Sequence, residues 1–109
     1  MTVKELYEKL ELTAVTLPDP DREIGGAYCC DLLSWVMGRA KADDVWITIM
    51  TNANIIAVAS LADTACILLA EGVSVDDDVK CLAETKGVNI LACTRPVFEA
   101  AAEVHALLK

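Results

Sequence analysis

The sequence predicts a single α/β domain over residues 1–109, with a mainly parallel sheet, helices on both faces and βα repeats. From Val45 onward, apolar β-branched segments alternate with helical segments, a pattern that forms parallel sheets through right-handed crossovers. The segments expected to be strands lack polar alternation, which is typical of strands covered on both faces. A chain of 109 residues, 55% of them hydrophobic, fits one core and leaves no room for a second.

The first part of the chain predicts two helices and two strands, over residues 2–10, 12–17, 24–30 and 31–38. Thr2 and Glu5 form a capping box at the start of the first helix. The strands over 12–17 and 24–30 are separated by a Pro-Asp-Pro-Asp turn. Asp31 is expected to cap the following helix, which ends near Gly38.

The second part predicts three strand–helix units, with strands at 45–50, 65–69 and 88–92 and helices at 54–62, 74–87 and 94–108. Three consecutive aspartates at residues 76–78 stand at a helix start, where carboxylates cap free N–H groups and favour the helix dipole. The last helix is expected to place Phe98 and Val104 on one apolar face.

Charge and hydropathy exclude several classes of partner. Seventeen Asp and Glu against nine Lys and Arg give a net charge of −8, which repels nucleic acids and anionic membrane surfaces. Residues 45–62 carry no charge, but the turn signal at 51–54 interrupts them, so no membrane span is expected. The first ten residues lack the apolar region of a signal peptide, and a cytoplasmic location is expected.

The cysteines and the single histidine predict neither a metal site nor catalysis. The cysteines have no zinc-type spacing, which favours reduced thiols without a metal or cofactor; they are Cys29, Cys30, Cys66, Cys81 and Cys93. His105 lies close to the end of the chain, where catalytic geometry is poorly held. No P-loop motif is present, so we expect no kinase activity and no enzyme.

Polar residues that follow the expected strands predict a ligand site. Asn52 and Asn54 follow one buried strand and Glu71 ends the next, at the sheet edge where α/β proteins bind ligands. Asp31 is expected nearby. The alternative is structural, with one asparagine capping the helix and the other stabilising the turn.

The sequence also resembles the DRTGG domain family over essentially its whole length. The resemblance rests on Asp21 and Arg22, on residues 26–28 and 31–34, and on residues 65–72 and 87–91. The family's Thr-Gly-Gly element reads Ala70, Glu71 and Gly72 here, so Asp21, Arg22 and Gly72 are the matching motif residues. The chain is similar in the same way to the N-terminal domain of HPr kinase/phosphorylase, which implies the fold but not the kinase activity of a separate domain.

This resemblance implies a non-enzymatic regulatory or ligand-sensing module that forms homodimers. Its ligand would be a small molecule or nucleotide. Residues 31–37 and 46–50 resemble small stand-alone members from anaerobic bacteria, which implies a link to hydrogenase or redox metabolism and a redox-enzyme partner. The alternative is a structural or assembly subunit that docks on a redox enzyme complex without a small ligand.

Overall fold

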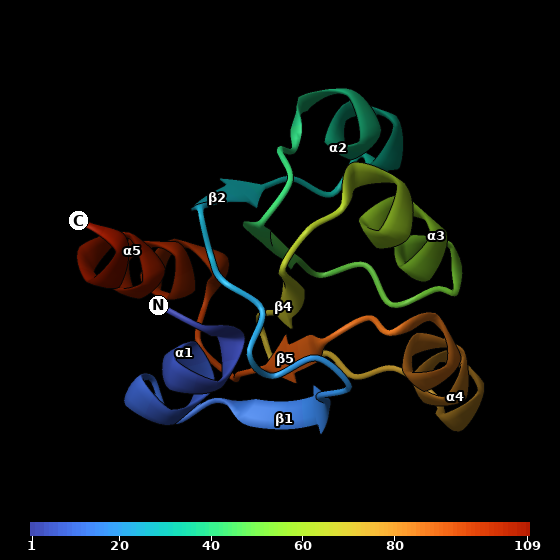
Figure 1. The fold of residues 1–109 in the computed structure, drawn as a ribbon, viewed down its shortest axis with the longest axis horizontal. Coiled ribbons are helices and arrows are strands. Elements are labelled where there is room, and N and C mark those ends of the chain that lie inside the picture. The colour runs from blue at the N-terminus through green and yellow to red at the C-terminus, as the bar shows by residue number, and fades with distance from the viewer.

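The computed structural model describes residues 1–109 as one five-stranded sheet with helices on both faces (Figure 1). The strands, in chain order, are β1 (Thr13–Thr16), β2 (Gly26–Cys29), β3 (Asp44–Thr48), β4 (Cys66–Leu69) and β5 (Ile90–Ala92). The helices are α1 (Val3–Lys9), α2 (Leu33–Arg39), α3 (Asn54–Ala62), α4 (Asp77–Lys86) and α5 (Val97–Leu108). The order across the sheet is β1-β5-β4-β3-β2, and only β1 runs antiparallel to its neighbour.

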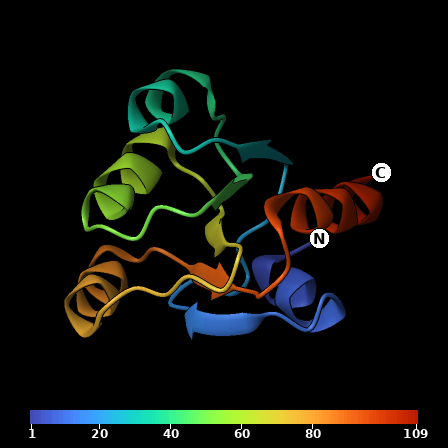
Figure 2. The same ribbon diagram turned by 180° about the vertical axis from the view of Figure 1, so that it is seen from behind.

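The helices divide into two layers. Strands β2 to β5 are sequential neighbours, and crossovers of one hand place α2, α3 and α4 on the same face of the sheet. Helices α1 and α5 cover the other face, as Figures 1 and 2 show from opposite sides. The predicted α/β fold with a mainly parallel sheet and helices on both faces is confirmed.

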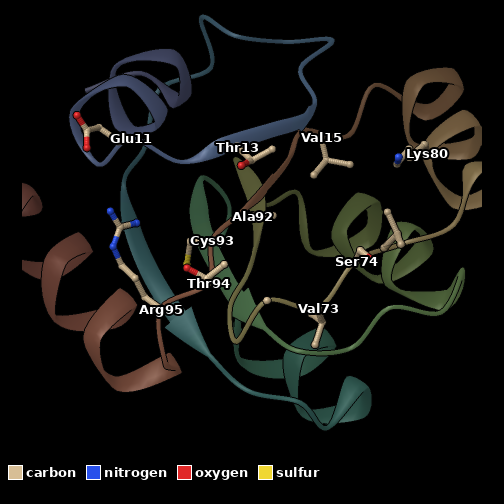
Figure 3. A pocket seen from close by; sticks show the side chains of 12 residues that line it. Glu11, Thr13, Val15, Val73, Ser74, Lys80, Ala92, Cys93, Thr94 and Arg95 are labelled. Atoms are coloured by element: carbon tan, nitrogen blue, oxygen red, sulfur yellow. The ribbon is translucent and has the colours of Figure 1, made fainter.

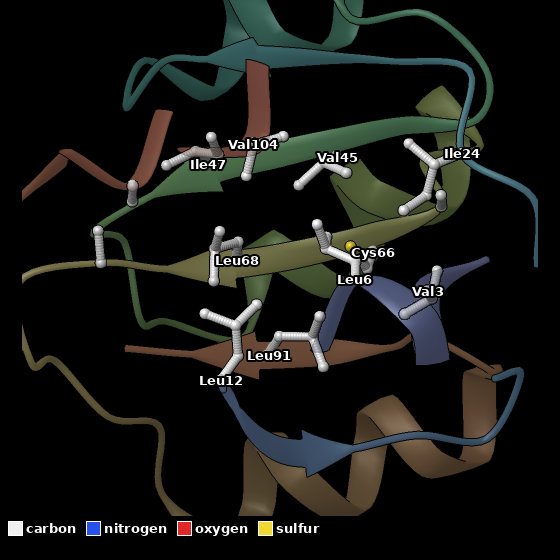
Figure 4. Close-up of a cluster of buried hydrophobic side chains, with 13 residues drawn as sticks. Val3, Leu6, Leu12, Ile24, Val45, Ile47, Cys66, Leu68, Leu91 and Val104 are labelled. Carbon is white, nitrogen blue, oxygen red and sulfur yellow. The ribbon is translucent and has the colours of Figure 1, made fainter. Parts of the chain in front are cut away.

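Alternate residues of β3, β4 and β5 belong to two separate buried clusters of 13 residues each. In β3, Val45 and Ile47 point toward α1 and α5, and Figure 4 shows them with Leu68, Leu91 and Val104. Trp46 points to the opposite face, among side chains of α2, α3 and α4. The aliphatic strands therefore bury both their faces, which explains why they lack polar alternation.

Several predicted details are corrected. All the strands are shorter than expected. The first strand, for which the sequence predicted no neighbour, lies beside β5 and runs antiparallel to it. Strand β3 ends at Thr48 because the backbone N–H of Ile49 donates to the Asp31 carboxylate and leaves the ladder. Phe98 is 83% exposed, because the buried stripe of α5 runs through Ala100 and Val104.

Capping at two helix starts is confirmed. The side chain of Thr2 accepts from the Glu5 N–H, and Glu5 accepts from the Thr2 N–H. This hydrogen bonding lowers the pKa of Glu5. Asp76 accepts from the Val79 N–H at 3.0 Å, so the acidic run does cap α4. None of the five helices is both long and apolar enough to span a membrane.

Candidate functional site

Asp31 holds the end of β3 and does not cap α2. Its Oδ1 accepts from the Thr48 hydroxyl at 2.7 Å and from the Ile49 N–H at 3.0 Å. Helix α2 starts after Leu32 without a side-chain cap. The expected cap is therefore wrong, because the Asp31 carboxylate is already engaged across the sheet edge.

Asn52 and Asn54 lie at the start of α3, and neither lines a cavity. The Oδ1 of Asn52 accepts from the Asn54 N–H at 2.9 Å, which closes an Asx turn before the helix. The Asn54 side chain is exposed and makes no hydrogen bond within the protein. This geometry favours the structural alternative for Asn52, and a binding role for the pair stays a prediction.

Replacing Asn52 with alanine is expected to lower the free energy of unfolding by about 1 kcal/mol, because the first turn of α3 loses its side-chain acceptor. Asn54→Ala is the matched control and should leave stability nearly unchanged. Urea denaturation followed by circular dichroism measures both. Equal losses for the two variants would contradict the assignment of the turn to Asn52.

Glu71 and Gly72 turn the chain sharply after β4. Both have left-handed backbones, with φ of 64° and 75°. Glu71 stands where the resemblance places a glycine, and this backbone costs a non-glycine residue roughly 1–2 kcal/mol. Its Oε2 accepts from the Val97 N–H at 2.8 Å, at the first residue of α5, where the helix dipole favours an anion. Glu71 is thus engaged with α5, and the contact offsets part of the strain.

A cavity of about 470 Å³ opens beside this turn, between the β1–β5 pair, the loop after β4 and α4 (Figure 3). It lies at the carboxyl edge of the parallel strands, where α/β sheets bind ligands. Its lining residues are Glu11, Thr13, Val15, Gly72, Val73, Ser74, Val75, Lys80, Ala92, Cys93, Thr94 and Arg95. Gly72, one of the predicted motif residues, is among them.

The cavity offers a cation and several hydroxyls. Lys80 is about half exposed, and its nearest carboxylate is that of Asp77 at 3.8 Å, a long surface pair that leaves the ammonium free to take an anion. Thr13, Ser74 and Thr94 supply hydroxyl groups. Arg95 is occupied, because it donates to the Leu10 carbonyl at 2.6 Å and pairs with Glu103 at 3.2 Å. The arrangement suits a polar ligand with an anionic group.

The sequence did not reveal this set of residues. Thr13 comes from β1, and only its long-range antiparallel pairing with Ala92 brings it to the cavity. Lys80 lies on α4 and belongs to no motif that the sequence analysis identified. The usable signal was Ser74 and Thr94, hydroxyl residues that follow neighbouring strands.

Arg22 acts at the opposite edge of the sheet. Its guanidinium donates to Asp43 Oδ1 at 2.9 Å and to the Asp63 backbone carbonyl at 2.8 Å, and pairs with the Asp63 carboxylate at 3.0 Å. Asp43 and Asp63 both have left-handed backbones. Arg22 therefore ties together two loops that precede β3 and β4, while Asp21 is exposed. Neither residue lines a cavity.

The cysteines are unpaired and dispersed. Burial raises the pKa of Cys66 to about 12, so its thiol is unreactive in the folded protein. Burial and the nearby Asp31 charge also raise the pKa of Cys29. No group of three His, Cys, Asp or Glu side chains is close enough to hold a metal ion.

Fold and cavity together define a small α/β domain with an open, polar cavity at the carboxyl edge of its parallel strands. The family model of the DRTGG domain matches residues 28–107, and the chain belongs to this family. The match begins after Asp21 and Arg22, so it does not bear on that pair. A search of curated protein sequences gives no match.

A solved structure has a similar fold. It contains the CBS and DRTGG domains of the regulatory region of Clostridium perfringens pyrophosphatase, complexed with the activator diadenosine tetraphosphate. The TM-score is 0.72 at 12% sequence identity, over 93% of this chain and 44% of that chain. The chain therefore spans less than half the length of that structure, and the likeness shows the fold.

Proposed function

We propose that this DRTGG domain is a non-enzymatic regulatory module that binds a small anionic molecule or nucleotide in the cavity beside Gly72. The observation that carries the proposal is the cavity itself, at the carboxyl edge of the sheet, which is lined by Lys80 and by three residues with hydroxyl groups. The pyrophosphatase of similar fold, whose regulatory region is complexed with a nucleotide activator, adds support from a relative.

The charges of the cavity limit the ligand. Glu11 lines the same space, Arg95 is already paired, and the chain carries a net charge of −8. A ligand with one or two phosphates matches a single free cation better than a long polyphosphate does. Apolar side chains such as Val15, Val73 and Val75 offer a surface for a base or another flat group.

Titration with adenosine diphosphate tests the proposal. Lys80→Gln is expected to weaken binding about fivefold, because one charge-assisted contact is lost. Lys86→Gln removes the same charge from the other end of α4, outside this cavity, and should leave the affinity unchanged. Isothermal calorimetry measures both, with inorganic phosphate and adenosine as separate probes of the anion and the base. Absence of binding, or equal weakening by both variants, would contradict the proposal.

We also propose an oligomeric state, a cellular location and a partner for this domain. It acts as a homodimer in the cytoplasm, with its free thiols reduced, and passes its signal to a redox enzyme such as a hydrogenase. Exposed apolar side chains on and beside α2, Leu32, Trp35 and Met37, supply surface for such contacts. The competing function, a structural subunit that docks without a small ligand, predicts partner binding that no nucleotide or phosphate changes.

A further inference from the structure

Strand β2 is the free parallel edge of the sheet, with β3 as its only neighbour (Figure 1). The N–H of Cys30 donates to the Ile47 carbonyl of β3 at 3.2 Å. Alternate residues of a strand direct their backbone groups to the same side, so Tyr28 also faces β3. The N–H and C=O groups of Ala27 and Cys29 therefore point away from the sheet, on the side where no strand pairs with β2.

A groove of about 360 Å³ lies beside the first residues of this strand. Residues 25–28 form one wall, and Arg39 and Lys41, at and just after the end of α2, stand with Asp44 on the other side. Gly25 and the first three residues of β2 line it, and the three strand residues span about 10 Å. A groove between an edge strand and a helix is the geometry in which an extended peptide adds to a sheet.

Gly26 lies close to the Asp44 side chain. A Cβ at this position would lie 2.9 Å from Asp44 Oδ1, so any other residue would have to displace this carboxylate, which lines the groove. Asp44 is more than nine-tenths buried, and its Oδ2 accepts from the Lys41 N–H at 2.8 Å. This hydrogen bond fixes the Asp44 carboxylate in the wall of the groove.

The positive charges beside the groove favour a peptide with acidic side chains. Arg39 and Lys41 are two of only nine cations in a chain of net charge −8. The Arg39 guanidinium lies over the Trp35 ring, 3.7 Å from its centroid, which holds it beside the groove. A second copy of the chain would bring the same two cations to the same groove, where like charges repel.

We propose that the edge of β2 binds an extended, acidic segment of a partner protein as an additional strand. The backbone groups of Ala27 and Cys29 pair with the segment, and Arg39 and Lys41 receive its carboxylates. This site is distinct from the cavity beside Gly72, and it serves the partner whether or not that cavity binds a small molecule.

A blocked peptide with alternating valine and glutamate tests the proposal, with the valine–lysine peptide of the same length as control. In titrations followed by ¹⁵N NMR, the acidic peptide is expected to shift the Ala27 and Cys29 amides and to slow their hydrogen exchange. Removing both cations, with Arg39→Gln and Lys41→Gln, should weaken it at least about tenfold. Lys4→Gln with Lys9→Gln removes two exposed lysines of α1 and should have no effect.

Backbone pairing is tested separately from charge. Ala27→Pro removes one outward N–H, a change that edge strands tolerate, and should weaken the acidic peptide without unfolding the domain. N-methylation of the peptide should do the same. Equal binding of the acidic and basic peptides, shifts that map away from β2, or dimerisation through β2 in place of peptide binding would each overturn the proposal.

Discussion

Replacing Asn89 with alanine is expected to lower the free energy of unfolding by about 3 kcal/mol. Asn89 is 2% exposed, just before β5, and its amide makes three hydrogen bonds. Its Oδ1 accepts from the Asp19 N–H at 2.9 Å, and its Nδ2 donates to the carbonyls of Asp19 at 2.8 Å and Ala65 at 3.0 Å. Alanine leaves the buried Ala65 carbonyl without this donor and releases the connection between β1 and β2.

Urea denaturation at neutral pH measures the loss. Asn89→Asp keeps the acceptor but removes both donated bonds, and it places an unpaired carboxylate in a buried site, so it should be at least as destabilising as alanine. The exposed Asn54→Ala serves as the control for an asparagine without side-chain contacts. A loss below about 1 kcal/mol for Asn89→Ala would show that the loop repairs its own hydrogen bonding.

Thr16→Val is expected to cost about 2 kcal/mol, although valine has nearly the same shape. The register between β1 and β5 shifts between Ala14 and Thr16. There the buried Thr16 hydroxyl accepts from the Ile90 N–H at 3.0 Å and donates to the Val88 carbonyl at 2.8 Å. The side chain thus replaces a rung of the ladder, and valine would leave both backbone groups unpaired.

The matched control is Thr13→Val, which changes an exposed residue of the same strand. Thr16→Ser retains the hydroxyl and should recover much of the stability that valine loses. Thermal and urea unfolding measure all three variants. If valine and serine cost the same, lost packing of the methyl group is the cause, and the bridging role is wrong.

The βα repeats were predictable because their information is local. Each buried strand and each helix from β3 to α5 has its own hydrophobic pattern, and right-handed crossovers then dictate the parallel order. The placement of β1 was not predictable in this way. Its pairing of Thr13 with Ala92 depends on contacts that no local pattern records.

The candidate site was also predictable where it depends on local pattern and not predictable where it depends on long-range contacts. The carboxyl edge of the sheet follows from the predicted topology, and a cavity does lie there. Which residues line it depends on side-chain contacts, and these engage Asp31 with Thr48 and Glu71 with Val97. Local composition could not show that the carboxylates expected to be free for a ligand are occupied within the protein.

The antiparallel pairing of β1 with β5 has a consequence for biosynthesis. The ribosome releases β1 early and β5 near the end, so the first strand waits without a neighbour while most of the chain is made. Strands β2 to β4 are able to assemble one unit at a time during this interval. Closure of the sheet depends on the strand pairing with the largest sequence separation, the kind of contact that slows folding. We therefore expect nascent chains that stop before β5 to keep β1 open to proteases and to chaperones.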